Sequence, residues 1–218
     1  MPDNTLKSRR LLAEFCKRLY ERDLVGSTQG NMSFRFAPDK ILITPTGGNL
    51  GYLKASDIVV INSRGDKLSG SGERSSEYDI HLKIYKARRD VMAVCHAHPI
   101  ALTAISLTKT RLNRPILPEI VCEFGTIPIA GFSAPGNSEL FDSISKYIGR
   151  HDAIILSNHG ALTVGATLEQ AVNRMEMLER YARTILATRS LGEIIEIPPE
   201  AAVKLPGYER IADQLSIK

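Results

Sequence analysis

The sequence has no apolar run that could cross a membrane. Hydrophobic residues make up 43% of its 218 residues and charged residues 24%, the ordinary balance of a globular protein. No stretch approaches the roughly 18 consecutive apolar residues that a membrane-spanning helix needs. The N-terminal stretch also lacks the continuous apolar segment and small-residue cleavage site of a secretory signal. We therefore expect a soluble protein with no membrane partner.

Cysteine is scarce. The three cysteines, Cys16, Cys95 and Cys122, are odd in number and form no C-x-x-C pair. Such a set suits reduced thiols better than a disulfide framework. We therefore expect a cytoplasmic protein.

Nucleotide-binding motifs are also missing. The chain has no Walker A motif and no G-x-G-x-x-G fingerprint after a strand. Its formal charge is +4 and its pI about 9.0, but the basic groups at 7–10 and 86–89 lie among acidic neighbours on expected helices. This pattern indicates solvated helix faces, so we expect no nucleic-acid partner. A mild positive excess suits a small phosphorylated substrate.

Strand and helix patterns alternate along the chain without a linker or an internal repeat, which predicts a single domain over 1–218 with a less certain tail from about 192. The hairpin pattern argues against a purely parallel sheet, so we expect an α/β fold with a central mixed, largely antiparallel sheet covered by helices. Helices are expected near 4–23, 76–89, 101–107, 137–148 and 168–191, and strands near 31–36, 40–45, 57–62, 91–98, 120–124, 126–130, 153–158 and 161–165.

Histidines are few, and two of the five occur together in VCHAHP. On a strand, His96 and His98 project to the same face while Cys95 points away. The pair alone is equally compatible with metal binding and with ordinary packing. His159, in SNHG beside a turn between strands, would complete three imidazoles, the ligand set of an open, catalytic type of zinc site. The other two, His81 and His151, are expected to be structural or exposed to solvent.

An acidic residue, Glu77, lies at the start of the helix that precedes this strand. The serines before it allow helix capping, through Ser76 and Asp79, and also an anion site at the helix N-terminus. Two glycine-containing loops, 26–33 and 44–48, are compatible with turns or with a phosphate cradle. A carboxylate near the metal would be placed for proton transfer.

Taken in order, GNMSFR, ITPTGG, SSEYDIH, HAHP and SNHGAL resemble the class II aldolase/adducin family, especially its L-fuculose-1-phosphate aldolase-like members. The resemblance implies a three-layer α/β/α domain, assembled as a homotetramer with active sites at subunit interfaces. It also implies that His96, His98 and His159 bind a divalent metal, most often Zn²⁺, with Mn²⁺ or Co²⁺ as alternatives.

The resemblance also implies roles for individual residues. Glu77 would transfer the proton in a retro-aldol cleavage of a small phosphorylated ketose, such as L-fuculose 1-phosphate, to dihydroxyacetone phosphate and an aldehyde. The substrate phosphate would be held by Asn31, Thr46, Gly47, Ser75 and Ser76.

One stretch departs from the family pattern. Glu119 stands about where the aldolases place a tyrosine, and resembles an acid/base glutamate of the methylthioribulose-1-phosphate dehydratases; it could equally be a surface carboxylate. Tyr208 is a candidate for a tyrosine that the aldolases contribute from a neighbouring subunit. Two alternatives to the aldolase therefore stay open. One is a methylthioribulose-1-phosphate dehydratase or another sugar-phosphate enzyme of the same superfamily, and the other is a non-catalytic, adducin-like interaction domain.

Overall fold

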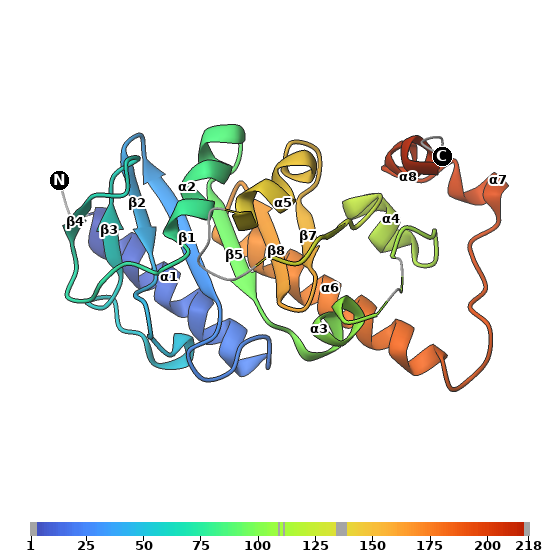
Figure 1. Cartoon of the computed structure of the whole chain (residues 1–218), viewed down its shortest axis with the longest axis horizontal. Coiled ribbons are helices and arrows are strands. Elements are labelled where there is room, and N and C mark those ends of the chain that lie inside the picture. The colour runs from blue at the N-terminus through green and yellow to red at the C-terminus, as the bar shows by residue number, and fades with distance from the viewer. Residues whose placement is uncertain (1–3, 109, 111, 134–138, 216–218) are drawn as a thin grey trace.

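The computed structural model of the protein describes residues 4–108, 110, 112–133 and 139–215. Its centre is an eight-stranded sheet with the strand order β4-β3-β2-β1-β5-β8-β7-β6 (Figure 1). The strands are β1 Asn31–Ala37, β2 Lys40–Ile43, β3 Val59–Ile61, β4 Lys67–Ser69, β5 Ala93–Ala97, β6 Ile129–Ala130, β7 Ala153–Leu156 and β8 Gly160–Gly165. Neighbours are antiparallel except β6 and β7, which are parallel. The predicted mixed, largely antiparallel sheet is confirmed.

Helices cover both faces of the sheet, as a three-layer fold requires. On one face α1 (Asn4–Glu21), α3 (Ile100–Ser106) and α6 (Leu168–Thr188) contribute Leu12, Leu102 and Leu178 to a core cluster. On the other, α2 (Tyr78–Ala87) and α5 (Glu139–Ile148) contribute to a second cluster through Ile84 and Ile144. Alternate side chains of the strands feed the two clusters, because successive strand residues point to opposite faces.

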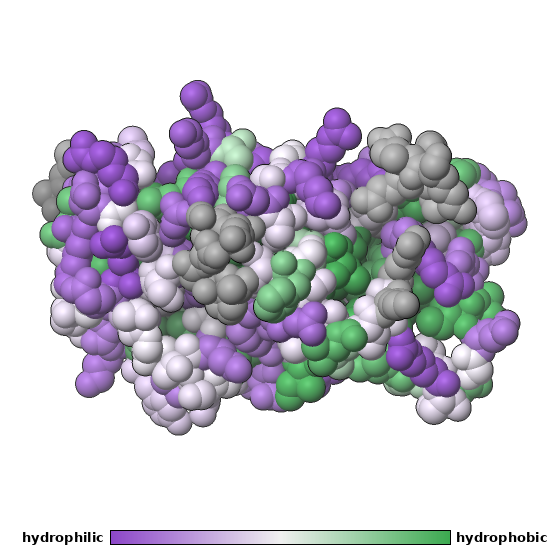
Figure 2. Space-filling view, in the orientation of Figure 1, coloured by the Kyte–Doolittle hydropathy of each residue, from purple (hydrophilic) through white to green (hydrophobic). Residues whose placement is uncertain are grey.

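The remaining elements lie outside these layers. They are the 3-10 turn η1 (Leu50–Tyr52) and the short helices α4 (Pro118–Phe124), α7 (Pro199–Ala202) and α8 (Tyr208–Leu215). Figure 1 shows α4, α7 and α8 grouped at the end of the molecule remote from β4. Figure 2 shows hydrophilic side chains over much of this face and apolar ones over α3, where Ile100 and Leu107 are exposed. Within the described part of the chain, no helix is long and apolar enough to span a membrane.

One predicted element is wrong. The segment 120–124 was expected to be a strand but belongs to α4, which begins at Pro118 and ends before Gly125, whose φ is 63°. Proline suits the first helical turn, and Ile120 and Phe124 are buried at helical spacing on one side. A short run rich in β-branched residues does not by itself separate a strand from a buried helix.

Other elements differ in extent. The strand expected at 126–130 shrinks to the two residues of β6. The strand β4 and the turn η1 were not predicted; β4 is short and exposed along its length, so it has no apolar alternation to detect. The helix expected from Asn137 corresponds to α5, and its predicted first residue lies outside the described residues.

Candidate active site

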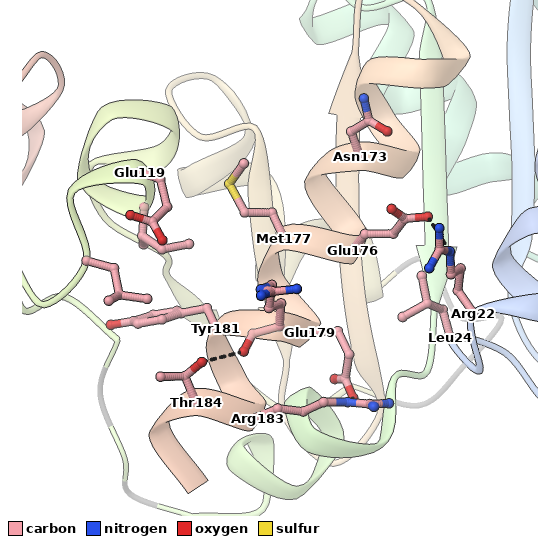
Figure 3. Close-up of a pocket in the computed structure, with 13 residues that line it drawn as sticks. Arg22, Leu24, Glu119, Asn173, Glu176, Met177, Glu179, Tyr181, Arg183 and Thr184 are labelled. Carbon is pink, nitrogen blue, oxygen red and sulfur yellow. Dashed lines mark hydrogen bonds and ion pairs between the residues drawn. The ribbon is translucent and has the colours of Figure 1, made fainter. Parts of the chain in front are cut away.

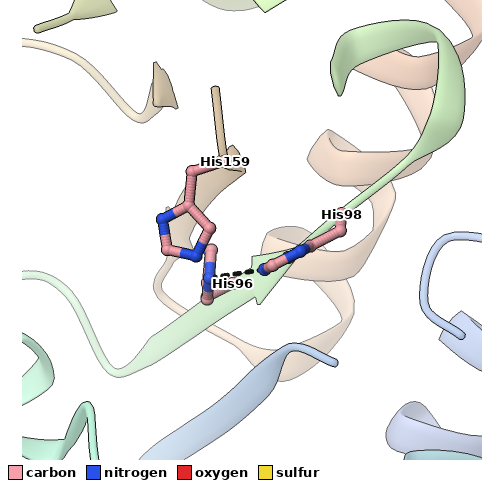
Figure 4. A group of neighbouring side chains, drawn as sticks. All are labelled: His96, His98 and His159. Atoms are coloured by element: carbon pink, nitrogen blue, oxygen red, sulfur yellow. Dashed lines mark hydrogen bonds between the residues drawn. The ribbon is translucent and has the colours of Figure 1, made fainter. Parts of the chain in front are cut away.

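Three imidazole rings converge where β5 ends. His96 lies in β5, His98 just beyond it, and His159 in the turn between β7 and β8 (Figure 4). Their ring centroids are 4.7 to 4.8 Å apart, and one potential ligand atom from each lies within 4.8 Å of the others. The structure therefore brings together all three predicted metal ligands.

Two glycines allow this close approach. A Cβ on Gly160 would lie 2.4 Å from the carbonyl oxygen of Ala97, so a side chain there would push the turn that carries His159 away from β5. Gly30 has a φ of +75°, and a Cβ there would lie 2.7 Å from the carbonyl oxygen of His96. Both positions need glycine to bring backbones into contact around the histidines.

Hydrogen bonding and burial prepare the imidazoles for a cation. The Nδ1–H of His96 donates to the carbonyl of Ala161 at 3.0 Å, which leaves the Nε2 lone pair free, and this Nε2 lies 3.0 Å from Nε2 of His98. Burial lowers the pKa of His98 to about 3 and that of His159 to about 4, favouring neutral rings. The His159 Nδ1 atom is buried without a hydrogen-bond partner among the described residues. Three converging imidazoles could hold a divalent metal, and they fit a site with an open coordination position.

A carboxylate stands beside this cluster. Glu77 is 9% exposed at the N-cap of α2, and its Oε2 lies 3.5 Å from Nε2 of His96. Burial raises the pKa of Glu77, but the proximity of His96 and a hydrogen bond from Asn31 together outweigh burial and hold that pKa below its usual value. The structure thus places an ionised acid next to the three histidines, where it could exchange a proton with a bound molecule. The capping bond predicted from Ser76 is not formed, because the helix begins only at Tyr78.

Two of the segments predicted to hold phosphate, the loop at 44–48 and the serines at 75–76, lie side by side. Thr46 N–H donates to the Glu73 carbonyl at 2.9 Å, and Ser75 N–H donates to the Thr44 carbonyl at 3.0 Å. The Ser75 hydroxyl accepts a hydrogen bond from the backbone of Glu77, which joins these loops to the acid. Thr46, Gly47 and Ser76 are exposed and Ser75 is buried. Their role in binding phosphate stays a prediction.

Asn31 takes part in this site through contacts that were not anticipated. Its amide nitrogen donates to Oε2 of Glu77, and its amide oxygen lies 2.6 Å from Nε2 of His81. His81 was expected to be either structural or exposed to solvent; it is fully buried, so the exposed alternative is wrong. The signal was present in SSEYDIH, because residues four apart on a helix share one face, as Glu77 and His81 do. His151 is half-buried and remote in sequence from this network.

Glu119 lies elsewhere. It is exposed in the first turn of α4 and lines a cavity of about 760 Å³ between α4 and α6 (Figure 3). Neither Glu77 nor any of the three clustered histidines is among the residues that line this cavity. They are Arg22, Leu24, Leu117, Glu119, Ile120, Asn173, Glu176, Met177, Glu179, Arg180, Tyr181, Arg183 and Thr184.

Tyr208 is the first residue of α8, which packs beside α4. A Cβ on Gly125 at the end of α4 would lie 2.7 Å from the Gly207 carbonyl. Within one chain, therefore, Tyr208 lies at the α4 end of the molecule. Cys95, which neighbours His96 in the sequence, is part of the hydrophobic core as predicted, not of the histidine cluster.

Comparison with known proteins gives a family match. The model of the family described as Class II Aldolase and Adducin N-terminal domain matches residues 10–186. A protein of Methanococcus maripaludis named L-fuculose phosphate aldolase is 35% identical over 170 residues, covering 78% of this chain and 91% of the relative. A protein of Pectobacterium atrosepticum named 3-oxo-tetronate 4-phosphate decarboxylase is 30% identical, covering 82% and 84%.

Solved structures agree with this match. A structure named L-fuculose 1-phosphate aldolase has a TM-score of 0.83 at 29% identity and covers 97% of both chains. The structure of YgbL from Escherichia coli has a TM-score of 0.85 at 26% identity and covers 92% of this chain and 98% of that one. The likeness therefore extends over nearly the whole chain, including the sheet and both helical layers.

Proposed function

The chain belongs to the class II aldolase and adducin family and is an enzyme of that superfamily, and from this premise we propose that it is a metal-dependent lyase that cleaves a carbon–carbon bond in a small phosphorylated ketose. The specific reaction proposed is retro-aldol cleavage of a ketose 1-phosphate, L-fuculose 1-phosphate or a close relative, to dihydroxyacetone phosphate and an aldehyde. The observation that carries the proposal is the buried Glu77 carboxylate 3.5 Å from one of three converging imidazoles.

The clustered histidines have the chemistry to hold a divalent metal ion. His96, His98 and His159 would bind a divalent ion, zinc first and manganese or cobalt as alternatives, and the ion would stabilise negative charge on the substrate's carbonyl and hydroxyl oxygens. Glu77 supplies the proton chemistry. When the bond breaks, the hydroxyl on the departing carbon gives its proton to the ionised Glu77 and becomes the aldehyde, while the electron pair stays on the carbon next to the ketone carbonyl. Glu77, now protonated, delivers that proton to this carbon to release the ketone product. In the direction of condensation the ionised carboxylate removes the same proton.

The loops at 44–48 and 73–76 would hold the phosphate. Their exposed groups are Thr46, Gly47 and Ser76, with Asn31 and Ser75 at the buried end next to Glu77. Binding the phosphate away from the reacting carbons orients the substrate for proton transfer.

Decarboxylation is the second candidate, supported by the relative named 3-oxo-tetronate 4-phosphate decarboxylase. Loss of CO₂ from a 3-oxo acid also leaves an electron pair on the carbon next to a carbonyl, so the same carboxylate would serve. A methylthioribulose-1-phosphate dehydratase would instead eliminate water and keep the carbon skeleton whole. Relatives named as enzymes and the retained histidine cluster argue against the non-catalytic, adducin-like alternative.

A substrate panel separates these reactions. Protein whose metal content has been measured is incubated with fuculose, rhamnulose, ribulose and 5-deoxyribulose 1-phosphates and with 3-oxo-tetronate 4-phosphate. We expect dihydroxyacetone phosphate with an aldehyde from a ketose phosphate; release of CO₂ would select the decarboxylase, and a product lighter by one water would select the dehydratase. Metal-loaded protein that converts none of them would overturn the proposal.

A homotetramer in the cytoplasm completes the proposal. Ile100 at the start of α3 and Leu107 just after its end are exposed, and this helix follows closely after His98. Exposed apolar side chains of this kind support a subunit contact near the site. The unpaired Cys16, Cys95 and Cys122 support a reducing compartment. Analytical ultracentrifugation tests the tetramer, and a monomer with full activity would contradict interfacial active sites.

A further inference from the structure

We propose that His81 is a positioning residue for Glu77: it orients the Asn31 amide so that Asn31 binds Oε2 of Glu77, which leaves Oε1 as the oxygen that exchanges protons with the substrate. The inference rests on the proposed function, because it assigns a role within the same site. It starts from a chain of buried side chains that the proposed reaction does not otherwise use.

Five polar side chains form this chain. From its far end, the Tyr85 hydroxyl lies 2.6 Å from Oγ of Ser33, which lies 2.7 Å from Nδ1 of His81. His81 Nε2 lies 2.6 Å from Oδ1 of Asn31, and Asn31 Nδ2 lies 2.6 Å from Oε2 of Glu77. None of the five is more than 9% exposed, so water does not compete for these bonds.

The donors and acceptors of these groups allow one direction of hydrogen bonding along this series of side chains. The Asn31 nitrogen faces Oε2 of Glu77 and donates to it, and the Asn31 oxygen, which can only accept, faces Nε2 of His81. His81 Nε2 must then carry the proton. A neutral His81, which burial favours by lowering its pKa to about 3, accepts at Nδ1 from Ser33. The Ser33 oxygen in turn accepts from the Tyr85 hydroxyl at 2.6 Å, the shorter of that hydroxyl's two contacts, the other being the Met92 carbonyl at 3.3 Å. Every donor in this series therefore points toward Glu77.

This direction explains why His81 matters to a residue it does not touch. An unrestrained asparagine amide can rotate by half a turn and present its oxygen in place of its nitrogen, which would repel the carboxylate. In this structure the rotated amide would also set its NH₂ group against the Nε2–H of His81. The histidine thus excludes the wrong orientation, and Glu77 is held through Oε2 alone.

The other carboxylate oxygen is the one left for chemistry. Oε1 of Glu77 is buried and has no hydrogen-bond partner among the described residues. Buried carboxylate oxygens are ordinarily bonded, so an unpartnered one beside a ligand site indicates a partner that arrives with the substrate.

This series of hydrogen-bonded side chains also links α2 to β1, the strand beside β5. Asn31 and Ser33 lie two apart on β1, and Glu77, His81 and Tyr85 follow one another at intervals of four along α2. These spacings put each set on one face of its element. Asn31 is paired with His96 across the β1–β5 ladder, so the chain positions the carboxylate relative to the strand of the metal ligands.

Two substitutions at one position test the role. His81→Phe removes both hydrogen bonds at similar volume, whereas His81→Gln can still direct an amide N–H toward Asn31. We expect His81→Phe to lower kcat by about 10- to 100-fold, the usual effect of losing an outer partner of a functional group, with a smaller change in KM. His81→Gln should recover most of the loss. Thr163→Val is the control. It removes a fully buried hydroxyl on β8 that donates to the Ala171 carbonyl and takes no part in the hydrogen bonds between Tyr85 and Glu77, so it should leave kcat unchanged.

A purely structural role gives a different result. If kcat of folded His81→Phe equals that of the wild type, or if Thr163→Val loses as much, the positioning role is wrong while the proposed reaction stands.

A second measurement does not depend on activity. Zinc-loaded protein labelled with ¹⁵N-histidine should show His81 as the neutral Nε2–H tautomer down to pH 5. An Nδ1–H tautomer or a protonated ring at pH 6 would overturn the direction of the chain. If the wild type converts no substrate of the panel, the proposed function fails, and the tautomer then decides the hydrogen-bond order by itself.

Discussion

Two glutamates that the sequence offered as catalytic candidates occupy opposite kinds of surroundings. Glu77 is enclosed, receives a hydrogen bond from Asn31 and lies beside His96, whereas Glu119 is exposed at the start of α4 and has no ion pair within the described part of the chain. The sequence placed Glu77 at the start of an expected helix and Glu119 just before an expected strand, whereas the structure places both at the start of a helix. What separates them is the set of groups that the tertiary fold brings to each, and a catalytic acid needs a fixed position as well as a carboxylate.

The largest expected effect on activity is that of a substitution at Glu77. Glu77→Gln keeps the shape and can still accept from Asn31, but it cannot carry the transferred proton. We expect kcat to fall by about 10² to 10⁴-fold, the usual contribution of a positioned acid/base group. Release of dihydroxyacetone phosphate measures it, with metal content determined on the same samples. A variant that keeps its metal and retains half of the wild-type activity would remove Glu77 from the mechanism.

The second prediction concerns a glutamate on the wall of the Glu119 cavity. Glu179 is 3% exposed and accepts hydrogen bonds from the backbone of Ala101 and Leu102 at the start of α3. Glu179→Ala leaves two buried N–H groups without partners, so we expect a loss of about 2–4 kcal/mol in the free energy of unfolding. Urea denaturation measures it.

The matched control for Glu179→Ala is Glu21→Ala. It removes an exposed partner of Lys17 on α1 and should cost less than about 1 kcal/mol. Equal losses for the two variants would show that the buried contacts to α3 contribute nothing special. A larger loss of unfolding free energy at Glu179 would mean that this glutamate on the cavity wall stabilises the fold, whereas the groups around Glu77 position an acid for the reaction.

A third prediction uses pH to separate the buried network from the exposed surface. Burial lowers the pKa of His81 to about 3, against the opposing charge of Glu77 and with the help of His96. An unfolded histidine titrates near pH 6.5, so between about pH 6.5 and 3 the unfolded chain binds more protons. Stability from this group is therefore complete above pH 6.5 and is lost as the pH falls.

The measurement is urea denaturation of wild type and His81→Gln between pH 4 and 8. The wild type should lose up to about 1.4 kcal/mol per pH unit more than the variant below pH 6. Parallel pH profiles would show that His81 titrates alike in the folded and unfolded chains.

Much of the fold could be predicted because its signals are local. Apolar alternation predicted the β1–β2 hairpin, and helical spacing predicted α1 and α6. The segment 120–124 was misassigned because burial against the rest of the protein, rather than its β-branched residues, decides its conformation. Strand β4 pairs with β3 through its backbone while its side chains stay exposed, so no pattern marks it.

The candidate site divides in the same way. The i, i+2 spacing of His96 and His98 and the motif around His159 pointed to a cluster that the structure brings together. The role of His81 depends on two bonds to β1, about fifty residues away in sequence, and no spacing rule reports such contacts. Asn31 was expected to contact phosphate, and its bonds to Glu77 and His81 became visible only with the fold.

The smallest expected effect returns to Glu119. Glu119→Gln removes an exposed charge that lines the cavity between α4 and α6, and solvent screens such a charge from the histidine cluster. We expect kcat and KM within about twofold of wild type, and a change in unfolding free energy within about 0.5 kcal/mol, as for other surface substitutions. If Glu119→Gln instead abolishes turnover while Glu77→Gln does not, the acid comes from α4. Because Glu119 is apart from Glu77 within one chain, that result would require a neighbouring subunit to supply it.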